Sequence, residues 1–339
     1  MPRGPPPKAK DEDESFWKGL VRDLLVAALI VALVLVAIYA YAGVWPPLVV
    51  IESSSMQHGD RESFIGVIDT GDMVFQQVAP TRESIVTYLE GRAAGYQTYG
   101  DYGDVIIFRR SSNPTPVIHR AIMYIVLHPD GTADVPALAG LPTSEWEASD
   151  SNGSTTSVSN LRFVTIHRMG YNHNLGITFD LSAFAGSGRT EGYITMGDNN
   201  AYRYCSLSRD PCSPSVPYDQ GWLVRQSDIV GRARGEIPWF GLLKLTFSPT
   251  PSCCTSWGDP EAPKNSWDWL LVSILFLIAL PFILEYSARG WTKYVSPRMP
   301  KIRWPRRRKK GEDEPVGGPN ARTAPEDPEG PPRGGSSGP

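Results

Sequence analysis

The sequence has no large excess of charge of either sign. Its 339 residues include 33 Lys or Arg and 36 Asp or Glu, which leaves a formal net charge of -3 at pH 7. This balance excludes a globally basic surface of the kind that binds nucleic acid. The sequence also lacks the internal repeats that mark solenoid proteins. Its length is sufficient for a core of about 150–200 residues together with further segments.

Charge is absent between Leu24 and Val44. This stretch of 21 residues would form a helix of about 30 Å, which is the thickness of the hydrocarbon core of a bilayer. No small-x-small cleavage site follows it, because the next residues are Trp45-Pro46-Pro47. The length of the run and the missing site favour an uncleaved membrane anchor over a cleaved secretory signal.

A second apolar run, from Trp269 to Leu284, is shorter. Its 16 uncharged residues are marginal for crossing a bilayer, but Trp267 and Tyr286 on its flanks are typical of a membrane interface. Pro281 within the run is tolerated in a membrane helix. The run therefore predicts a second transmembrane helix, and a buried or re-entrant helix is the alternative.

Basic residues are distributed unevenly around the two runs. Lys18 and Arg22 precede the first run, and no Lys or Arg follows it until Arg61. Residues 289–310, after the second run, contain ten Lys or Arg and no acid. By the positive-inside rule, both termini are cytoplasmic and the segment between the runs is extracytoplasmic. The basic cluster is expected to contact anionic lipid headgroups.

The segment between the runs has the pattern of a β-rich domain. Gly, Pro, Asn and Asp separate short runs of β-branched and aromatic residues, namely Asp104–Phe108, Arg120–Leu127 and Leu161–Ile166. No long amphipathic helix pattern interrupts them. The Ser- and Thr-rich stretch Thr143–Asn160 is expected to be an exposed loop or insertion.

The predicted organisation of the chain has six parts. They are a disordered cytoplasmic N-terminus (1–22), a first transmembrane helix (23–44), an extracytoplasmic β-rich domain (45–250), a linker (251–266), a second transmembrane helix (267–288) and a cytoplasmic tail that is basic and then rich in Gly and Pro (289–339).

Only four cysteines are present, and all fall in the predicted extracytoplasmic part: Cys205, Cys212, Cys253 and Cys254. An even number in an oxidising compartment favours disulfides over a metal site. Three pairings are open. The loop between Cys205 and Cys212 is the easiest to close, and a bridge between the adjacent Cys253 and Cys254 is not expected. The sequon at Asn152 is compatible with this compartment.

Ser53-Ser54-Ser55-Met56 lies directly after the first apolar run. A serine hydroxyl becomes a nucleophile only when a base removes its proton, and histidine is the usual base. His119 ends one extended run and precedes another, so its backbone should be rigid and its side chain directed. Four further histidines offer the same chemistry in less favourable contexts: His58, His128, His167 and His173.

Several short motifs follow the apolar run in a fixed order. They are Ser53-Ser54-Ser55-Met56, Gly71-Asp72-Met73-Val74, Gly103-Asp104-Val105-Ile106-Ile107-Phe108, Val117-Ile118-His119-Arg120 and Gly192-Tyr193-Ile194-Thr195-Met196-Gly197-Asp198-Asn199-Asn200. This series resembles the successive boxes of type I signal peptidases over about residues 45–235. It is most similar to the archaeal and endoplasmic-reticulum type, in which histidine replaces the lysine of the common bacterial enzymes. The resemblance implies a signal-peptidase-like antiparallel β-sheet domain, so we expect a mainly β fold flanked by N- and C-terminal transmembrane helices.

The resemblance also implies roles for individual residues. Ser55 matches the nucleophile and His119 the general base. Ser53 matches the serine whose hydroxyl helps to bind the oxyanion, together with the backbone N–H of Ser55. Asp198 matches the aspartate that the family needs in its Gly-Asp-Asn box.

The acid that orients His119 is left open. In archaeal relatives an aspartate follows the Gly-Asp-Asn-Asn box after a few residues, but here residues 201–205 contain no acid. Asp219 precedes a closing strand, as the family aspartate does, which would make Ser206–Pro217 an insertion. Asp198 and Asp219 are therefore equal candidates, and Asp210 is a third.

The expected function is that of a signal peptidase I, a membrane-bound serine endopeptidase that removes signal peptides from secreted preproteins. The resemblance implies no metal and no organic cofactor. The expected partners are preprotein signal peptides, membrane lipids and the secretion translocon, with no nucleic acid. The location that fits best is an archaeal cytoplasmic membrane. The alternatives are a non-catalytic β-domain that binds extended peptides, and a related membrane protease that acts on other surface precursors.

Overall fold

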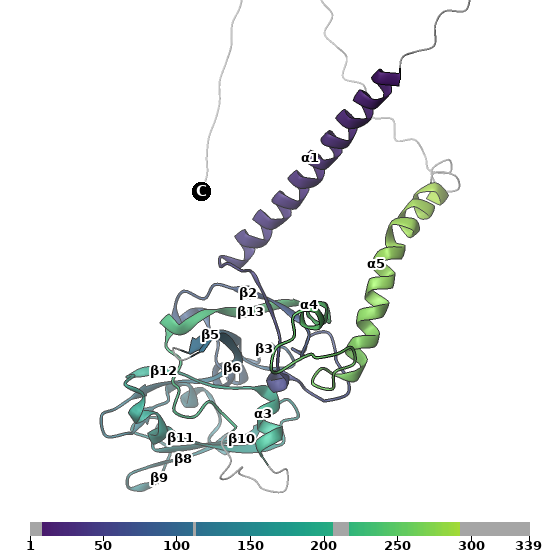
Figure 1. Ribbon diagram of the computed structural model, residues 1–339. Coiled ribbons are helices and arrows are strands. Elements are labelled where there is room, and N and C mark those ends of the chain that lie inside the picture. The colour runs from purple at the N-terminus through teal and green to yellow at the C-terminus, as the bar shows by residue number, and fades with distance from the viewer. Residues whose placement is uncertain (1–8, 111–112, 206–216, 292–339) are drawn as a thin grey trace, which may run out of the picture. The chain divides into compact units, whose positions relative to one another are not determined.

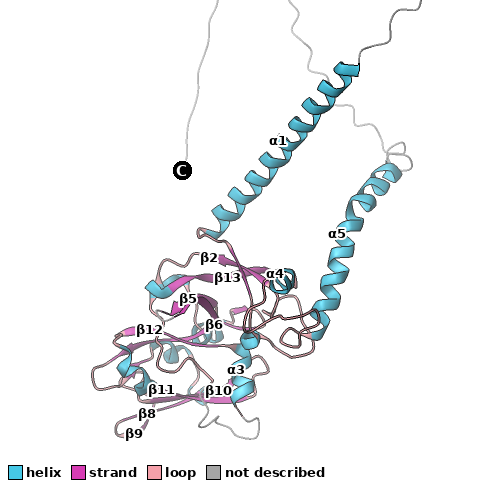
Figure 2. Cartoon of the chain, viewed as in Figure 1, coloured by secondary structure: helices cyan, strands magenta, loops and turns pink. Residues whose placement is uncertain are grey.

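The computed structural model describes residues 9–110, 113–205 and 217–291. It is a mixture of helix and antiparallel sheet, with 38% helix and 28% strand. The expectation of a mainly β chain is therefore right only in part, because two long helices and several short ones accompany the sheets. Figure 2 distinguishes the helices from the strands, which all belong to the part of the sequence between the two long helices. The chain divides into two units, Met1–Pro281 and Phe282–Pro339.

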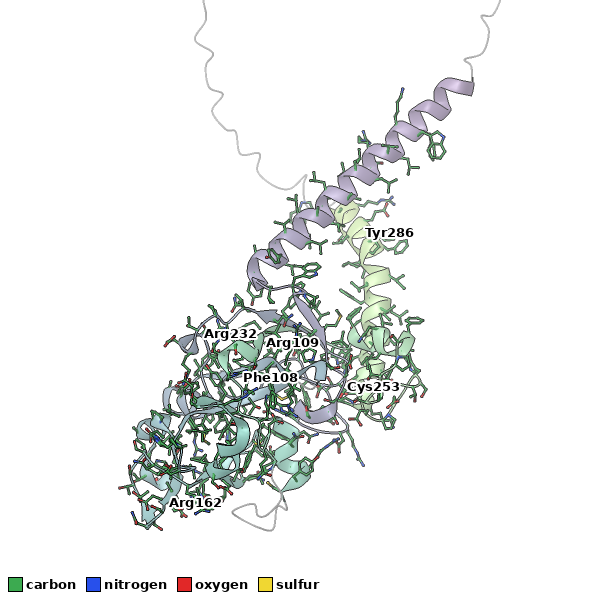
Figure 3. All side chains as sticks on the ribbon, turned by 60° about the vertical axis from the view of Figure 1, so that its left-hand side comes forward. Phe108, Arg109, Arg162, Arg232, Cys253 and Tyr286 are labelled. Atoms are coloured by element: carbon green, nitrogen blue, oxygen red, sulfur yellow. A yellow bond between two sulfur atoms is a disulfide. The ribbon has the colours of Figure 1, made fainter. Side chains whose placement is uncertain are left out.

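The two long helices are α1 (Ala9–Ala42) and α5 (Lys264–Gly290). Each is long and apolar enough to cross a membrane. Apolar side chains project around the circumference of α1 (Figure 3), and those between Leu24 and Tyr41 are largely exposed. Exposure of so much apolar surface is unfavourable in water and favourable in lipid. The helix α1 begins at Ala9, inside the stretch expected to be disordered, and α5 extends past the predicted bounds at both ends.

A seven-stranded antiparallel sheet forms the centre of the fold (Figure 1). Its strand order is β1-β2-β13-β5-β6-β12, and β7 pairs with β6. The strands are β1 (Leu48–Val50), β2 (Met73–Gln77), β5 (Val105–Arg110), β6 (Asn113–Leu127), β7 (Ala133–Asp134), β12 (Glu191–Met196) and β13 (Ile229–Ile237). Two of the three predicted strands, Asp104–Phe108 and Arg120–Leu127, correspond to β5 and to the second half of β6.

A second antiparallel sheet has the order β11-β10-β8-β9. Its strands are β8 (Trp146–Asp150), β9 (Gly153–Thr155), β10 (Phe163–Met169) and β11 (Leu175–Asp180), and a separate hairpin joins β3 (Gln97–Thr98) to β4 (Asp101–Tyr102). The third predicted strand corresponds to β10. The expectation of an exposed loop at Thr143–Asn160 is wrong, because β8 and β9 lie within it and Trp146 and Ala148 are buried.

Short helices connect these strands. The α-helices are α2 (Tyr88–Ala94), α3 (Asp198–Tyr204) and α4 (Gly241–Phe247), and the 3-10 turns are Ser54–Met56, Arg82–Ser84, Pro136–Gly140, Thr143–Glu145, Leu181–Ser187 and Gln226–Asp228. The first residues of α2 show how local sequence sets a boundary. Thr87 and Glu90 form a reciprocal capping box, and Gly95 ends the helix in the left-handed conformation with φ 72°.

The central strand β5 is buried on both of its faces. Ile106 and Phe108 pack in one apolar cluster, and Val105 packs in another. This explains why its sequence is a continuous apolar run rather than an alternating one. The adjacent strand β6 pairs with β5 in a register that places Ile106 opposite His119. The register of this pair therefore places His119 beside the buried Ile106.

Candidate active site

The candidate site is built around the 3-10 turn Ser54–Met56, which follows β1. Met56 is buried in an apolar cluster with Ile51 and Val74, so the turn is anchored by a side chain that belongs to the core. Ser54 is also buried, whereas Ser53 and Ser55 are half-buried. The hydroxyl oxygens of Ser53 and Ser55 are 3.4 Å apart. The turn thus presents the Ser55 hydroxyl at the edge of the core.

His119 is the histidine that meets this turn. Its Nε2 lies 3.3 Å from Ser55 Oγ, and its Nδ1 lies 2.7 Å from a carboxylate oxygen of Asp219. The side chain of His119 is 9% exposed, so its environment excludes most of the solvent. A serine, an imidazole and a carboxylate are thereby joined in one hydrogen-bonded chain.

Asp219 reaches His119 because its segment extends beside the end of β12. The Asp219 N–H donates to the Thr195 carbonyl at 2.9 Å, and the Thr195 hydroxyl donates to the Asp219 carboxylate at 2.5 Å. Arg110 forms an ion pair with the same carboxylate. Burial alone would raise the pKa of Asp219, but His119, Arg110 and Thr195 lower it to about 2. The carboxylate is therefore ionised when it holds the imidazole.

Asp198 lies at the start of α3 and has different partners. It accepts two hydrogen bonds from the fully buried Arg120, at 2.8 Å and 2.6 Å, and it is 3.1 Å from His58 Nε2. Burial would raise the pKa of Asp198, but the Arg120 guanidinium and His58 lower it to about 2. Of the two equal candidates, the structure brings Asp219 to His119 and Asp198 to Arg120. The third, Asp210, lies outside the described residues.

Gly197 allows α3 to approach the turn closely. A Cβ at this position would lie 2.5 Å from the Ser55 carbonyl oxygen and 3.0 Å from His119 Nε2. Both distances are too short, and the first contact is with backbone that cannot move without displacing Ser55. Glycine is therefore required at position 197 because α3 approaches Ser55 and His119 closely, and not because of its backbone conformation.

The other histidines lie in different surroundings. His58 stacks on Tyr171 with ring centroids 4.1 Å apart. His128 pairs with Asp134 at 2.9 Å, and His167 lies 3.4 Å from Glu147. The ring of His173 lies near that of Tyr102. Among the described residues, His119 is the histidine that is hydrogen-bonded to Ser55.

A groove of about 580 Å³ opens beside Ser55. Residues 48–53, which include β1 at the edge of the sheet, line one part of it, and residues 115–119 of β6 line another. Arg110 and Asp219 also line it. Lys244 and Glu52 also line it and form an ion pair of 2.8 Å. Two extended segments thus line the groove, together with Ser55, His119 and Asp219.

Several residues that contact this site were not predicted from the sequence. Thr195 and Asn199 lie within the motif of residues 192–200, so the sequence marked their neighbourhood as part of a candidate site. No motif contains Arg110 or Glu261. Arg110 is the last residue of the apolar strand β5, and Glu261 lies in the linker before α5. Their proximity to Asp219 and Ser54 comes from long-range packing alone.

Cys253 and Cys254 form a disulfide with each other, which the sequence analysis did not expect. Cys205 is also in a disulfide, and Cys212 lies outside the described residues. Ligand atoms of Cys253, Cys254 and Asp259 lie within 4.8 Å of one another, the arrangement of a small metal site. The disulfide occupies both sulfurs, however, so the group lacks the thiolates that a metal would need.

Comparisons with protein-family models, with curated proteins and with solved structures found no match to this chain.

Proposed function

We propose that this protein is a membrane-anchored serine endopeptidase of the type I signal peptidase kind, which removes signal peptides from secreted preproteins. The observation that carries the proposal is the hydrogen-bonded chain of Ser55, His119 and Asp219. Three residues from separate parts of the sequence meet in the order nucleophile, base and acid. That arrangement supports acyl transfer through an activated serine.

In the proposed mechanism His119 Nε2 accepts the Ser55 proton as Oγ attacks the carbonyl carbon of the scissile peptide. The new C–O bond creates an oxyanion, which the backbone N–H of Ser55 and the Ser53 hydroxyl stabilise. His119 then gives its proton to the leaving amine as the C–N bond breaks. Water hydrolyses the acyl-enzyme with His119 again as base. Asp219, ionised throughout, holds Nδ1–H and so selects the tautomer that leaves Nε2 free to accept.

The extended segments that line the groove support an extended peptide as substrate. The edge strand β1 can add a peptide by main-chain hydrogen bonds, and small pockets can then select alternate side chains. Such selection suits a cleavage site with small residues, as in signal peptides. No nucleic acid, metal or organic cofactor has a part in this reaction.

The two apolar helices support a location in the membrane. With the basic flanks in the cytoplasm, the domain between the helices would face the extracytoplasmic side of a multi-pass protein. An archaeal cytoplasmic membrane fits the histidine type of site. Preproteins emerging from the translocon, and the membrane lipids, would then be its partners.

Cleavage of a preprotein by the purified full-length protein in liposomes tests the proposal. Ser55→Ala and His119→Ala should each lower kcat by about 10³-fold or more, because either change removes the activated nucleophile. Thermal unfolding of both variants should remain close to that of the wild type. Undiminished cleavage by Ser55→Ala would exclude the proposed mechanism, and binding without cleavage by the wild type would favour a peptide-binding domain. Cleavage of surface precursors in preference to preproteins would favour a different protease.

A further inference from the structure

The residue before the proposed nucleophile is held from two sides. The Ser54 carbonyl accepts a hydrogen bond of 2.9 Å from the Asn199 side-chain amide. On the other side, one carboxylate oxygen of Glu261 accepts from the Ser54 hydroxyl at 2.5 Å and from the Ser54 N–H at 3.3 Å. Ser54 is 1% exposed, so water does not compete for these groups.

These contacts set the direction of the proposed oxyanion donor. The Ser54 carbonyl and the Ser55 N–H belong to one planar trans peptide, in which they point in opposite directions. Asn199, by holding the carbonyl, therefore aims the Ser55 N–H. Glu261 holds the preceding peptide and the Ser54 side chain, so both peptides that flank Ser54 are restrained. The backbone dihedral angles of Ser54, which connect these two peptides and set the position of Ser55, therefore have little freedom.

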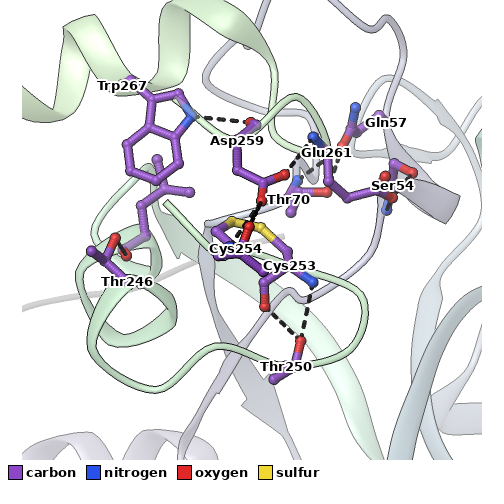
Figure 4. The surroundings of a disulfide bond; sticks show 12 residues. Ser54, Gln57, Thr70, Thr246, Thr250, Cys253, Cys254, Asp259, Glu261 and Trp267 are labelled. Atoms are coloured by element: carbon purple, nitrogen blue, oxygen red, sulfur yellow. Dashed lines mark hydrogen bonds between the residues drawn. A yellow bond between two sulfur atoms is a disulfide. The ribbon is translucent and has the colours of Figure 1, made fainter. Parts of the chain in front are cut away.

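Glu261 comes from a segment remote in sequence, the linker that leads into α5. Figure 4 shows this segment beside Ser54, with the disulfide of Cys253 and Cys254 nearby. Asp259 accepts from the Glu261 N–H at 3.1 Å, and its carbonyl accepts from the Trp267 ring nitrogen at 3.4 Å. Trp267, at the start of α5, is 3% exposed. The carboxylate is thus presented by a packed linker rather than by a free loop.

We propose that Glu261 is a positioning residue for the Ser54–Ser55 peptides, so that the linker before the second apolar helix completes the proposed active site. This inference rests on the proposed function. Glu261 does not touch the reacting atoms and acts through Ser54. Its contribution lies in the transition state, where the direction of the Ser55 N–H matters most.

The test is preprotein cleavage by the full-length protein in liposomes. Glu261→Ala should lower kcat by about 10-fold or more with KM within about 2-fold, because a misdirected donor weakens transition-state binding alone. Glu261→Gln keeps an acceptor oxygen and should retain kcat within about 3-fold. Glu62→Ala removes an exposed glutamate and should match the wild type. Wild-type kcat in Glu261→Ala, or equal losses in the Gln and Ala variants, would overturn the inference.

A double variant separates positioning from general stability. Ser54→Ala removes the stronger of the two donors to Glu261, so it should lower kcat, and Glu261→Ala should cost less in that background than alone. Fully additive losses would overturn the inference. If Glu261→Ala fails to fold, Ser54→Ala carries the test, and unchanged kcat there would assign Glu261 a structural role only.

The two proposals fail in different ways. An inactive Ser55→Ala with a fully active Glu261→Ala would overturn the inference and leave the proposed function standing. A fully active Ser55→Ala, or a wild type without cleavage, would overturn both.

Discussion

Asp219 and Asp198 are both buried aspartates with a lowered pKa, yet their neighbours differ. Asp219 is held by His119 and by the partly exposed Arg110. Asp198 is the counter-ion of Arg120, a fully buried guanidinium. One nitrogen of that group, Nη1, also lies 3.0–3.3 Å from four backbone carbonyl oxygens of residues 98–103, which share its two N–H groups. Asp198 also lies 3.1 Å from His58 Nε2, but among the described residues that imidazole makes no hydrogen bond with Ser55. Asp219 is thus the carboxylate that serves the imidazole beside Ser55, and Asp198 is foremost the partner of a buried guanidinium.

This difference predicts opposite results for two isosteric substitutions. Asp219→Asn should lower kcat by about 10³–10⁴-fold with little change in thermal unfolding, because the amide no longer stabilises the imidazolium or its tautomer. Asp198→Asn should lower the free energy of unfolding by about 3–5 kcal/mol, because the buried Arg120 loses its counter-charge. Cleavage kinetics and thermal melts of both variants check this. A strongly destabilised Asp219→Asn would contradict the distinction.

The sequence singled out Ser55 and His119 but left the choice of aspartate open. The first two stand in short motifs whose neighbours are specific. Asp198 and Asp219 could not be separated, because the choice depends on which carboxylate packs beside the imidazole. His119 in β6 contacts Asp219, which lies 100 positions later in the sequence. No local sequence pattern predicts a contact of this kind.

Among the elements, the turn between Ile68 and Asp72 supports the segment that carries Ser55. The Ile51 N–H donates to the Asp72 carbonyl and the Gly71 N–H to the Ile51 carbonyl, each at 2.9 Å. The Thr70 hydroxyl donates to the Gln57 side chain at 2.5 Å. Asp69 in this turn is 1% exposed. Burial raises its pKa to about 7, although Ser63 and the charge of His58 oppose the shift.

The raised pKa makes stability depend on pH in a defined direction. Below about pH 4 Asp69 is protonated in both the folded and unfolded states and has no effect. Between about pH 4 and pH 7 the unfolded state loses this proton first, so the contribution of Asp69 to the free energy of unfolding falls as pH rises, by up to about 4 kcal/mol. Above about pH 7 the loss is constant.

Asp69→Asn should remove this dependence. Relative to the wild type, the variant should gain thermal stability at pH 8 and much less at pH 4.5, because an amide has no proton to lose. Melting curves of both proteins in detergent at the two pH values check this. Titrating groups that do not interact with Asp69 cancel in the comparison, whereas Asp72, which Asp69 contacts electrostatically, contributes to the difference. An equal difference at both pH values would contradict the assigned cause.

The strands show where a sequence pattern suffices and where it does not. The apolar runs at β5, β6 and β10 were predicted correctly because β-branched residues and flanking turn residues act locally. The stretch Thr143–Asn160 was mistaken for a loop because Ser and Thr dominate its composition. Its two buried residues, Trp146 and Ala148, flank the exposed Glu147. So short an alternation predicts a strand only once β8 is known to pair with β10.

For the whole molecule, the two apolar helices and the basic cluster predict the sidedness of the chain. In sealed, right-side-out membrane vesicles, protease added outside should digest the domain between α1 and α5 and leave the tail 289–339 protected. Detergent should expose the tail. Antibodies against a C-terminal tag and against the domain can report both. A tail digested in intact vesicles would contradict the predicted topology.

The sequence by itself determined the two apolar helices, the β-rich segment between them and the motifs that contain Ser55 and His119. Each of these depends on local composition and spacing, which the chain displays directly. Only the tertiary structure decided that Asp219 meets His119, that Asp198 neutralises Arg120 and that Glu261 holds Ser54. Those contacts arise from packing and strand register between residues far apart in the chain, and burial strengthens each of them by excluding water.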